Sequence, residues 1–578
     1  MNSSVPKSLR ILALASTLLS APAAQYAFAA AVEPGRSQSG NYLAGLIAGE
    51  DRDEAAAAIL YREALRADPK NLDLVERAFA AALASGDMRE AFPLAERVLQ
   101  REPTNSLARL SLAVKAFGEG QYALARTHLS LGQAGRAHDV TTTMLSAWAL
   151  AGQKDLRDAL STLDRMQDGS ILAFRNYHAG LIASVMGAAG DSEKRLQQAF
   201  RAQTSTLRFA DAYARALARR NARSDADAVL NEFAKSVPHH ALVEANRAMI
   251  DSGKPIDQLV HDAKEGAAET LYGLGAAGGR QGDELAQVVY LRLALHLRPD
   301  LDVAAMGLAE VFEQLHQLDA SLEAYALVPS TSALRPTAEI QAALTLDASE
   351  RADEARRRLK IIVDANSKNF EAWTALGSIQ RAAKQFPEAI ESYDKAIAGI
   401  EKPDRSNWTL FYFRAICFER SHDWPKAEAD FKKALELFPE QPLVLNYLGY
   451  SWVDQGINLD DAFKMLRRAV ELRPTDGYIV DSLGWAHYKL GHYDESLRIL
   501  EKAIEMKPAD PTVNDHLGDV YWRVNRRTEA HFQWNHARDN DPDKDDLPMI
   551  LKKIDKGLPD EKSGENKAGE AAPVKNGG

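Results

Sequence analysis

The chain has 578 residues, a formal net charge of −11 and a pI near 5.8, and 46% of its residues are hydrophobic. This acidic balance, without any long block of lysine or arginine, argues against nucleic acid or an anionic membrane surface as the main partner. The one cysteine, Cys417, excludes an intramolecular disulfide and a cysteine zinc site. Its apolar neighbours predict a small buried side chain.

Residues 1–29 have the features of a signal peptide. Two basic residues, Lys7 and Arg10, precede an apolar run over residues 11–19, and small residues at 27–29 offer a cleavage site. The run is too short to span a bilayer, which needs about 20 residues. We expect an exported protein, periplasmic and soluble. The alternative is a frayed N-terminal helix on a cytoplasmic protein.

The next part of the chain carries the first signs of a repeat. In residues 30–129, Pro103 follows Pro69 by 34 residues, and Tyr61 falls at a matching place within its unit. Between residues 130 and 270 the signature fades, although alanine-rich amphipathic stretches keep helical spacing. We interpret 30–129 as N-terminal helix-pair repeats and 130–270 as degenerate copies of them.

The clearest repeats lie in residues 271–543. Each unit combines a leucine-glycine pair in its first helix, an alanine about twenty residues later and a closing proline. A helix pair of this length cannot bury its own apolar face, so copies must stack on one another. The closing prolines recur every 34 or 35 residues, at Pro439, Pro474, Pro508 and Pro542.

The chain after the last repeat divides into two short segments. Residues 544–559 include an amphipathic stretch, 547–554, which we expect to form a capping helix over the last repeat. Residues 560–578 are rich in lysine, glutamate, glycine and alanine and have almost nothing to bury, which predicts a disordered tail.

The repeat resembles the tetratricopeptide repeat, whose pattern of tryptophan, leucine, glycine, alanine and tyrosine is matched in sequence order by Trp373, Leu376, Gly377, Ala389 and Tyr393. The resemblance implies an all-α fold, a superhelical solenoid of stacked helix-turn-helix repeats.

A narrower resemblance covers residues 446–497, which are similar to the C-terminal repeats of large bacterial envelope proteins that act as adaptors for a carboxyl-terminal processing protease. Those adaptors are often lipoproteins. This chain departs from them, because it has no cysteine near its N-terminus to carry a lipid.

The sequence shows no catalytic constellation. Gly273, Gly275 and Gly278 spell G-x-G-x-x-G, but no strand precedes them and Gly275 falls at the glycine position of a repeat, so we interpret them as packing residues. Neither a nucleophile elbow nor a phosphate loop is present, and no two histidines have the spacing of a helical zinc site. We therefore predict a non-enzyme without cofactor or metal. An enzyme with a site hidden in 130–270 is the weaker alternative.

The resemblance also selects candidate binding residues, because the first helices of such repeats line a concave groove. Trp373, Trp452 and Trp534 occupy packing positions, whereas Trp485 and Trp522 are available. Aromatic side chains beside charged ones are suited to binding anchors. The predicted groove residues are Arg381, Tyr412, Asn446, Tyr450, Asp454, Asp481, Trp485, Tyr488, Lys489, Asp515, Asp519, Trp522 and Arg523.

The predicted partner is a protein surface or an extended peptide held in this groove, without a clamp for a terminal carboxylate. The hypothesis is a scaffold or adaptor in the bacterial cell envelope that presents substrates to a processing protease. A scaffold for polysaccharide or outer-membrane assembly machinery is the alternative, and no residue in the chain separates the two.

Overall fold

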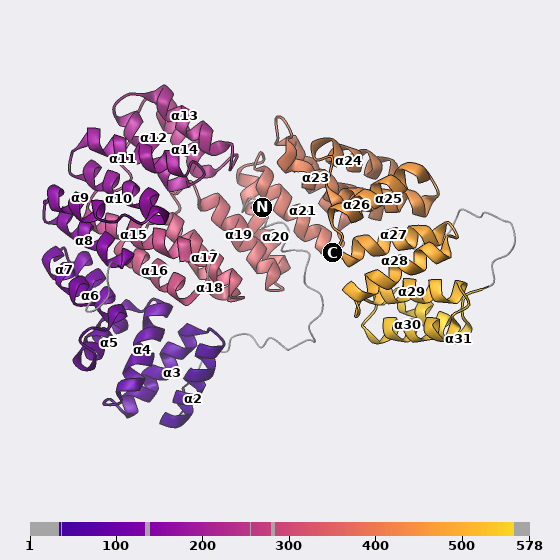
Figure 1. Cartoon of the computed structure of the whole chain (residues 1–578), viewed down its shortest axis with the longest axis horizontal. Helices are drawn as coiled ribbons and strands as arrows, with labels where there is room; N and C mark the ends of the chain where they lie inside the picture. Colours follow the sequence, from indigo (N-terminus) through magenta and orange to yellow (C-terminus); the bar gives the residue numbers. More distant parts are fainter. Residues whose placement is uncertain (1–33, 36, 133–138, 255, 279–283, 560–578) are drawn as a thin grey trace. The chain divides into compact units, whose positions relative to one another are not determined.

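The computed structural model describes residues 34–35, 37–132, 139–254, 256–278 and 284–559 (Figure 1). Within these ranges the chain forms α-helices, two short 3-10 helices and no strand, which confirms the predicted all-α class. The chain divides into two compact units, Met1–Arg358 and Leu359–Gly578. The predicted signal peptide and the predicted disordered tail lie outside the described residues.

The helices of the first unit are α2 (Gln38–Glu50), α3 (Glu54–Ala67), α4 (Leu72–Ser85), α5 (Met88–Arg101), α6 (Ser106–Gly118), α7 (Tyr122–Gly132), α8 (Val140–Gly152), α9 (Leu156–Asp164), α10 (Leu172–Val185), α11 (Ala189–Ala202), α12 (Leu207–Arg219), α13 (Arg223–Ala234), α14 (Ala241–Ser252), α15 (Ala263–Gly278), α16 (Glu284–Leu297), α17 (Asp302–Gln314), α18 (Leu318–Ala326) and α19 (Arg335–Ala348).

The division between the units falls within α20 (Ala352–Ala365). The helices of the second unit are α21 (Phe370–Ala382), α22 (Phe386–Ala398), α23 (Trp408–Arg420), α24 (Trp424–Leu437), α25 (Pro442–Gln455), α26 (Leu459–Leu472), α27 (Gly477–Lys489), α28 (Tyr493–Met506), α29 (Pro511–Arg523), α30 (Arg527–Asp539) and α31 (Leu547–Lys556).

Consecutive helices pack as pairs, and local sequence explains where they begin. Asn71, Asn105 and Asp510 each precede a first helix and accept a backbone N–H from its first turn, which satisfies a donor that has no partner within the helix. Pro442 and Pro511 stand at the start of α25 and α29, where a missing N–H costs nothing.

Small residues at fixed positions let the two helices of a pair approach closely, as the sequence predicts. A Cβ added at Gly484 would lie 2.7 Å from Cγ of Leu500, and one at Gly518 would lie 2.5 Å from Cδ1 of Trp534. On the second helices, Ala469, Ala503 and Ala537 are fully buried. Stacked helix pairs of this kind confirm the solenoid predicted from the repeat period. Cys417 is buried, also as predicted.

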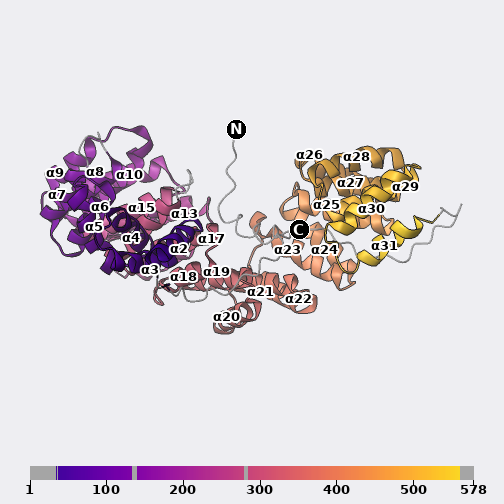
Figure 2. The same ribbon diagram turned by 90° about the horizontal axis from the view of Figure 1, so that it is seen from below.

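The first unit departs from a simple linear stack. Helices α15 and α16 contact not only their neighbours in sequence but also the first helices of earlier repeats, since α15 packs on α6, α8 and α10, and α16 packs on α4 and α6. Both views show α15 lying beside α8 and α10 (Figures 1 and 2). The chain therefore covers this inner surface with its own helices.

Two glycines on α15 make room for this packing. A Cβ at Gly266 would lie 2.2 Å from Cε3 of Trp148, and a Cβ at Gly273 would lie 2.6 Å from Cε2 of Phe174. Trp148 is fully buried. Interior packing leaves no space for an extra carbon at such distances, so α15 and the aromatic residues of α8 and α10 fit each other closely. Gly273 and Gly275 are thus packing residues inside a helix, as predicted for the G-x-G-x-x-G run.

We predict that Gly266→Ala destabilises the first unit by about 1–3 kcal/mol, because the new methyl group must displace the Trp148 ring. Chemical denaturation followed by circular dichroism measures this change. Gly190→Ala is the matched control, since a Cβ there meets nothing within 4 Å, and the better helix propensity of alanine should leave stability equal or slightly higher. Equal stability of the Gly266→Ala variant and the wild type would contradict the packing described.

Candidate functional site

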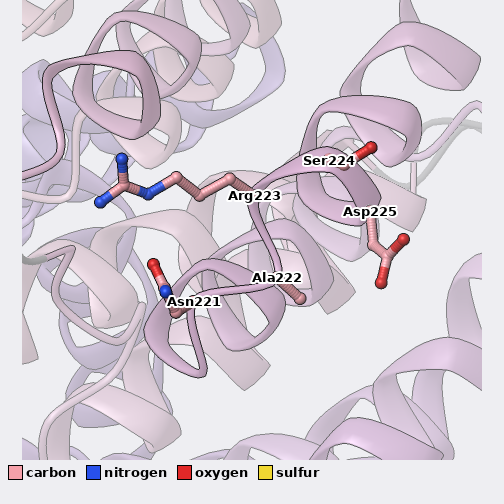
Figure 3. Close-up of a pocket in the computed structure, with 5 residues that line it drawn as sticks. All are labelled: Asn221, Ala222, Arg223, Ser224 and Asp225. Carbon is pink, nitrogen blue, oxygen red and sulfur yellow. The ribbon is translucent and has the colours of Figure 1, made fainter.

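A shallow pocket of about 470 Å³ lies at the turn between α12 and α13, inside the region where a hidden enzyme site was the alternative. Its lining residues are Asn221, Ala222, Arg223, Ser224 and Asp225. Figure 3 shows the Arg223 and Asp225 side chains pointing away from each other. These five residues offer one hydroxyl and no imidazole, and they do not converge on a common point. The arrangement does not resemble a catalytic site.

A buried network of charges was not foreseen from the sequence of the degenerate region. Arg208 on α12 binds both carboxylate oxygens of Glu269 on α15, at 2.8 and 2.5 Å, and the Tyr177 hydroxyl donates to the same carboxylate at 2.7 Å. Asp211 accepts from Asn246 at 2.7 Å and from Arg215 at 2.5 Å. The first helices α10, α12 and α14 are thereby tied to one another and to α15.

The charges of this network stabilise the packing of the helices and are not arranged for catalysis. Burial opposes the charge of Glu269, but Arg208 and Tyr177 outweigh that effect and lower the pKa of its carboxyl. Glu269 therefore stays ionised and fully engaged, and it has no free lone pair aimed at solvent with which to act as a base. The sequence carries no specific signal for this cluster, because α12 and α15 also contain charged residues outside it, such as Arg219 and Glu265.

In the second unit, the predicted groove residues of α25, α27 and α29 lie along one surface. Asp454 pairs with Lys489 at 3.0 Å, and Arg523 donates to the Tyr488 hydroxyl at 3.4 Å. Each contact joins residues 35 apart, which is one repeat. We call the surface formed by the following residues the first-helix face: Tyr450, Asp454, Asp481, Trp485, Tyr488, Lys489, Asp515, Asp519, Trp522 and Arg523.

An aromatic stack stands at the centre of this face. The Trp485 ring lies parallel to Tyr488, with centroids 4.5 Å apart, and to His516, with centroids 3.9 Å apart. His516 also contacts the Asp481 carboxylate at 3.0 Å. His516 was not predicted as a site residue. The signal that could have found it is the repeat register, because it lies one repeat beyond Asp481.

Exposure separates the predicted residues into two groups. Asn446, Tyr450, Asp481 and Asp519 are between 4% and 8% exposed, so a partner could not contact them directly without a rearrangement. Lys489 is exposed, and the remaining members of the first-helix face are half-buried. Those half-buried and exposed side chains form the surface on which a partner could lie.

The two upstream residues lie apart from the stack. Arg381 on α21 sits over the Phe413 ring at 4.5 Å. Tyr412 on α23 contacts the rings of Trp408, Phe431 and Tyr447, and burial raises its pKa to about 12. Tyr412 packs against these rings and is half-buried, so its place in the groove stays a prediction.

The last helix, α31, covers one end of the first-helix face. Nζ of Lys553 lies 2.6 Å from Asp515 and 2.8 Å from Asp519, and Arg523 donates to the carbonyl of Pro559 at 2.9 Å. Burial raises the pKa of Asp519 to about 6 despite the opposing charge of Lys553. The sequence predicts a helix at this place, but nothing in it shows that the lysine reaches two of the predicted site residues.

We predict that Glu269→Ala destabilises the first unit by about 3–5 kcal/mol, because Arg208 would remain buried without its partner. The double variant Arg208→Leu/Glu269→Leu is the comparison. It removes both charges, so it should recover much of the loss in urea denaturation. A double variant no more stable than Glu269→Ala would show that the loss does not come from leaving Arg208 buried without its partner.

We predict that His516 titrates above the usual 6.5. Burial lowers its pKa, but the Asp481 carboxylate more than offsets that effect. Because the folded-state pKa is raised, protonated His516 stabilises the fold below the unfolded pKa, and this contribution is lost as pH rises through the folded pKa. NMR titration of the ring measures the midpoint. Asp481→Asn should lower it, and an unchanged midpoint would contradict the assignment.

Comparison with known protein families identifies the repeats. Models described as tetratricopeptide repeat match residues 82–141, 340–405, 414–477 and 481–510. A TPR repeat-containing protein of Pseudomonas aeruginosa, PA4667, is 27% identical over 206 residues. That match covers 33% of this chain and 32% of the relative, so the chain spans about a third of the relative's length.

Solved structures with similar local folds include yeast Tom70, at 15% identity over 90% of this chain and 95% of that chain, with a TM-score of 0.30. The Cut9-Hcn1 hetero-tetramer of the APC/C matches at 15% identity over 90% of this chain and 96% of that chain, with a TM-score of 0.38. At such scores the chains do not superpose as wholes. The sequence matches, together with the stacked helix pairs, show that this protein contains tetratricopeptide repeats.

Proposed function

We propose that this protein is a non-catalytic scaffold or adaptor, and that it binds a protein or an extended peptide on the part of the first-helix face formed by α25 and α27. The observation that carries the proposal is the half-buried stack of Trp485 on Tyr488 and His516, next to the ion pair of exposed Lys489 with half-buried Asp454. Rigid aromatic rings beside charged groups lose little entropy on binding and still provide directional contacts.

The packing of the first unit supports this location. Its first helices α4, α6, α8 and α10 are covered by α15 and α16, so their inner surface is already occupied. The corresponding helices α25 and α27 of the second unit instead present polar and aromatic side chains with partial exposure. A partner that binds first helices therefore has accessible contacts on α25 and α27 that α4, α6, α8 and α10 do not offer.

The proposed setting is the bacterial cell envelope, after export directed by residues 1–29. The proposed role is the presentation of substrates to a processing protease, which rests on the resemblance of residues 446–497 to adaptor repeats. A scaffold for polysaccharide or outer-membrane assembly machinery is the second candidate. Among the helices in the described ranges, none has the length and apolar character needed to cross a membrane.

The proposed division of the chain follows the same interpretation: repeats over 30–129, degenerate repeats over 130–270, repeats over 271–543 and a capping segment over 544–559. Partner binding would then take place within residues 271–543.

We predict that a Trp485→Ala/Lys489→Glu variant loses partner binding by tenfold or more, because it removes the central ring and reverses the exposed charge. The test is affinity purification from envelope extract followed by mass spectrometry, with Kd measured for the captured partner. Arg498→Glu is the matched control. It lies on the second helix α28 with its side chain 70% exposed, so it should bind like the wild type.

The identity of the captured protein separates the two roles. A processing protease or its substrates would support the adaptor role, and assembly proteins would support the alternative. Equal binding by the wild type and the folded Trp485→Ala/Lys489→Glu variant would place the binding surface elsewhere and contradict the proposed site.

A further inference from the structure

The C-terminal end of the first-helix face is built as a receptor that the chain fills with its own helix. Asp515, Asp519, Trp522 and Arg523 on α29 receive the segment from Lys553 to Pro559, and we call these four residues the lysine seat. The ammonium group of Lys553 bridges the two carboxylates at 2.6 and 2.8 Å. Two acids on one cation are a specific arrangement, because a neutral or acidic side chain at the same place would leave both carboxylates without this cation.

Part of the seat is held in place by its own repeat. Asp519 accepts a hydrogen bond at 2.9 Å from Nε1 of Trp534, a side chain that is fully buried between α29 and α30. The Trp522 ring lies against Trp534 with centroids 5.4 Å apart. Asp519 and the Trp522 ring are therefore oriented by contacts within the last repeat as well as by α31, as binding sites require.

The helix that fills the seat buries fewer of its residues than the repeat helices near it. Of the residues in α31, only Ile550 is buried, whereas α29 buries Val513, Asn514, Leu517 and four others. Met549 and Leu551 of α31 are 57% and 45% exposed. Hydrophobic stabilisation scales with the apolar area removed from water, so α31 has less of it than its neighbours. The contacts of Lys553 with the two carboxylates add to the packing of α31 on α30.

We propose that the lysine seat is a docking site for an amphipathic helix of a partner protein, and that α31 occupies this site in cis until such a helix displaces it. The pattern that fits is read from α31 itself. The partner helix would carry a lysine three residues after one apolar residue and directly before another. In α31 these residues are Lys553, Ile550 and Ile554. The Gly557 backbone, which passes over Trp522, adds a close contact in which a Cβ would lie 2.0 Å from the ring.

Displacement of this kind has a simple physical requirement. The partner helix must replace the charge of Lys553 and cover the same apolar strip, and α31 must be able to leave without unfolding α29 and α30. The short segment between α30 and α31 is not helical, so displacement of α31 breaks no continuous helix. A helix-in-groove complex then forms with the same side-chain spacing.

The test uses the full chain and a synthetic peptide of residues 546–559 as the probe. We expect a Lys553→Gln chain to bind the labelled peptide at least tenfold more tightly than the wild type, because its own α31 no longer competes while the seat is unchanged. Lys552→Gln is the matched control. Lys552 is exposed, and the variant chain should bind the peptide as weakly as the wild type. A peptide that carries Lys553→Gln should bind at least tenfold more weakly.

Hydrogen exchange measured by mass spectrometry gives a second readout that does not need the peptide. In the Lys553→Gln chain, amides of α31 should exchange at least tenfold faster, and those of α29 should not change. Equal peptide binding by the three chains would overturn the proposal, and so would loss of protection in α29 along with α31. A concentration-dependent dimer of the wild type that Lys553→Gln abolishes would assign the seat to a second copy and also overturn it.

The proposal for the lysine seat does not depend on the partner proposed for α25 and α27. Its variants leave Trp485 and Lys489 unchanged, and its probe comes from this chain. Failure of the envelope purification would therefore leave the peptide experiment standing, and failure of the peptide experiment would leave the α25 and α27 surface untouched.

Discussion

The fold depends on one constraint, which is that a pair of helices about 34 residues long exposes an apolar side that it cannot bury alone. Close approach within each pair, at glycines such as Gly484 and Gly518, fixes the thickness of a repeat. Stacking then buries Leu500, Trp534 and their equivalents. Every remaining feature concerns how the chain covers the surfaces that stacking leaves open.

The two units cover their first helices in different ways. In the first unit, α15 enters among α6, α8 and α10, and its Glu269 is neutralised by Arg208 and Tyr177. In the second unit, no helix enters among α25, α27 and α29 in the described residues, and their side chains instead pair with each other from repeat to repeat. The first solution gives a closed interior. The second leaves polar and aromatic groups at a surface that a partner can reach.

The period of the sequence was sufficient to predict the helix pairs, the buried alanines and the glycine contacts, because these follow from a local pattern repeated in register. Helix α31 also has a sequence signal, since it is amphipathic and follows the last repeat. The packing of α15 into the first unit has no such signal. It depends on contacts such as Gly266 with Trp148, which lie 118 positions apart and belong to no repeat position.

The candidate site was predictable in part for the same reason. Counting from the glycine of each repeat placed Asp454, Trp485 and Lys489 on one surface, because the register of first helices is set by stacking. It could not tell which of the selected side chains are buried. Burial depends on contacts with the next repeat or with α31. Tyr450 contacts Trp485, Asp481 contacts His516, and Asp519 contacts Lys553 of α31.

Solvent exposure decides which of these contacts a partner could take over. The Asp454 and Lys489 pair is exposed on the lysine side, with relative side-chain exposures of 16% and 38%, and an ion pair near the surface is worth about 0–1 kcal/mol. Breaking it to bind a partner therefore costs little. Lys553 is only 13% exposed between two carboxylates, so removing it without replacement leaves buried acids uncompensated. A ligand at α25 and α27 can bind by adding contacts, whereas a ligand at α29 must bring its own cation.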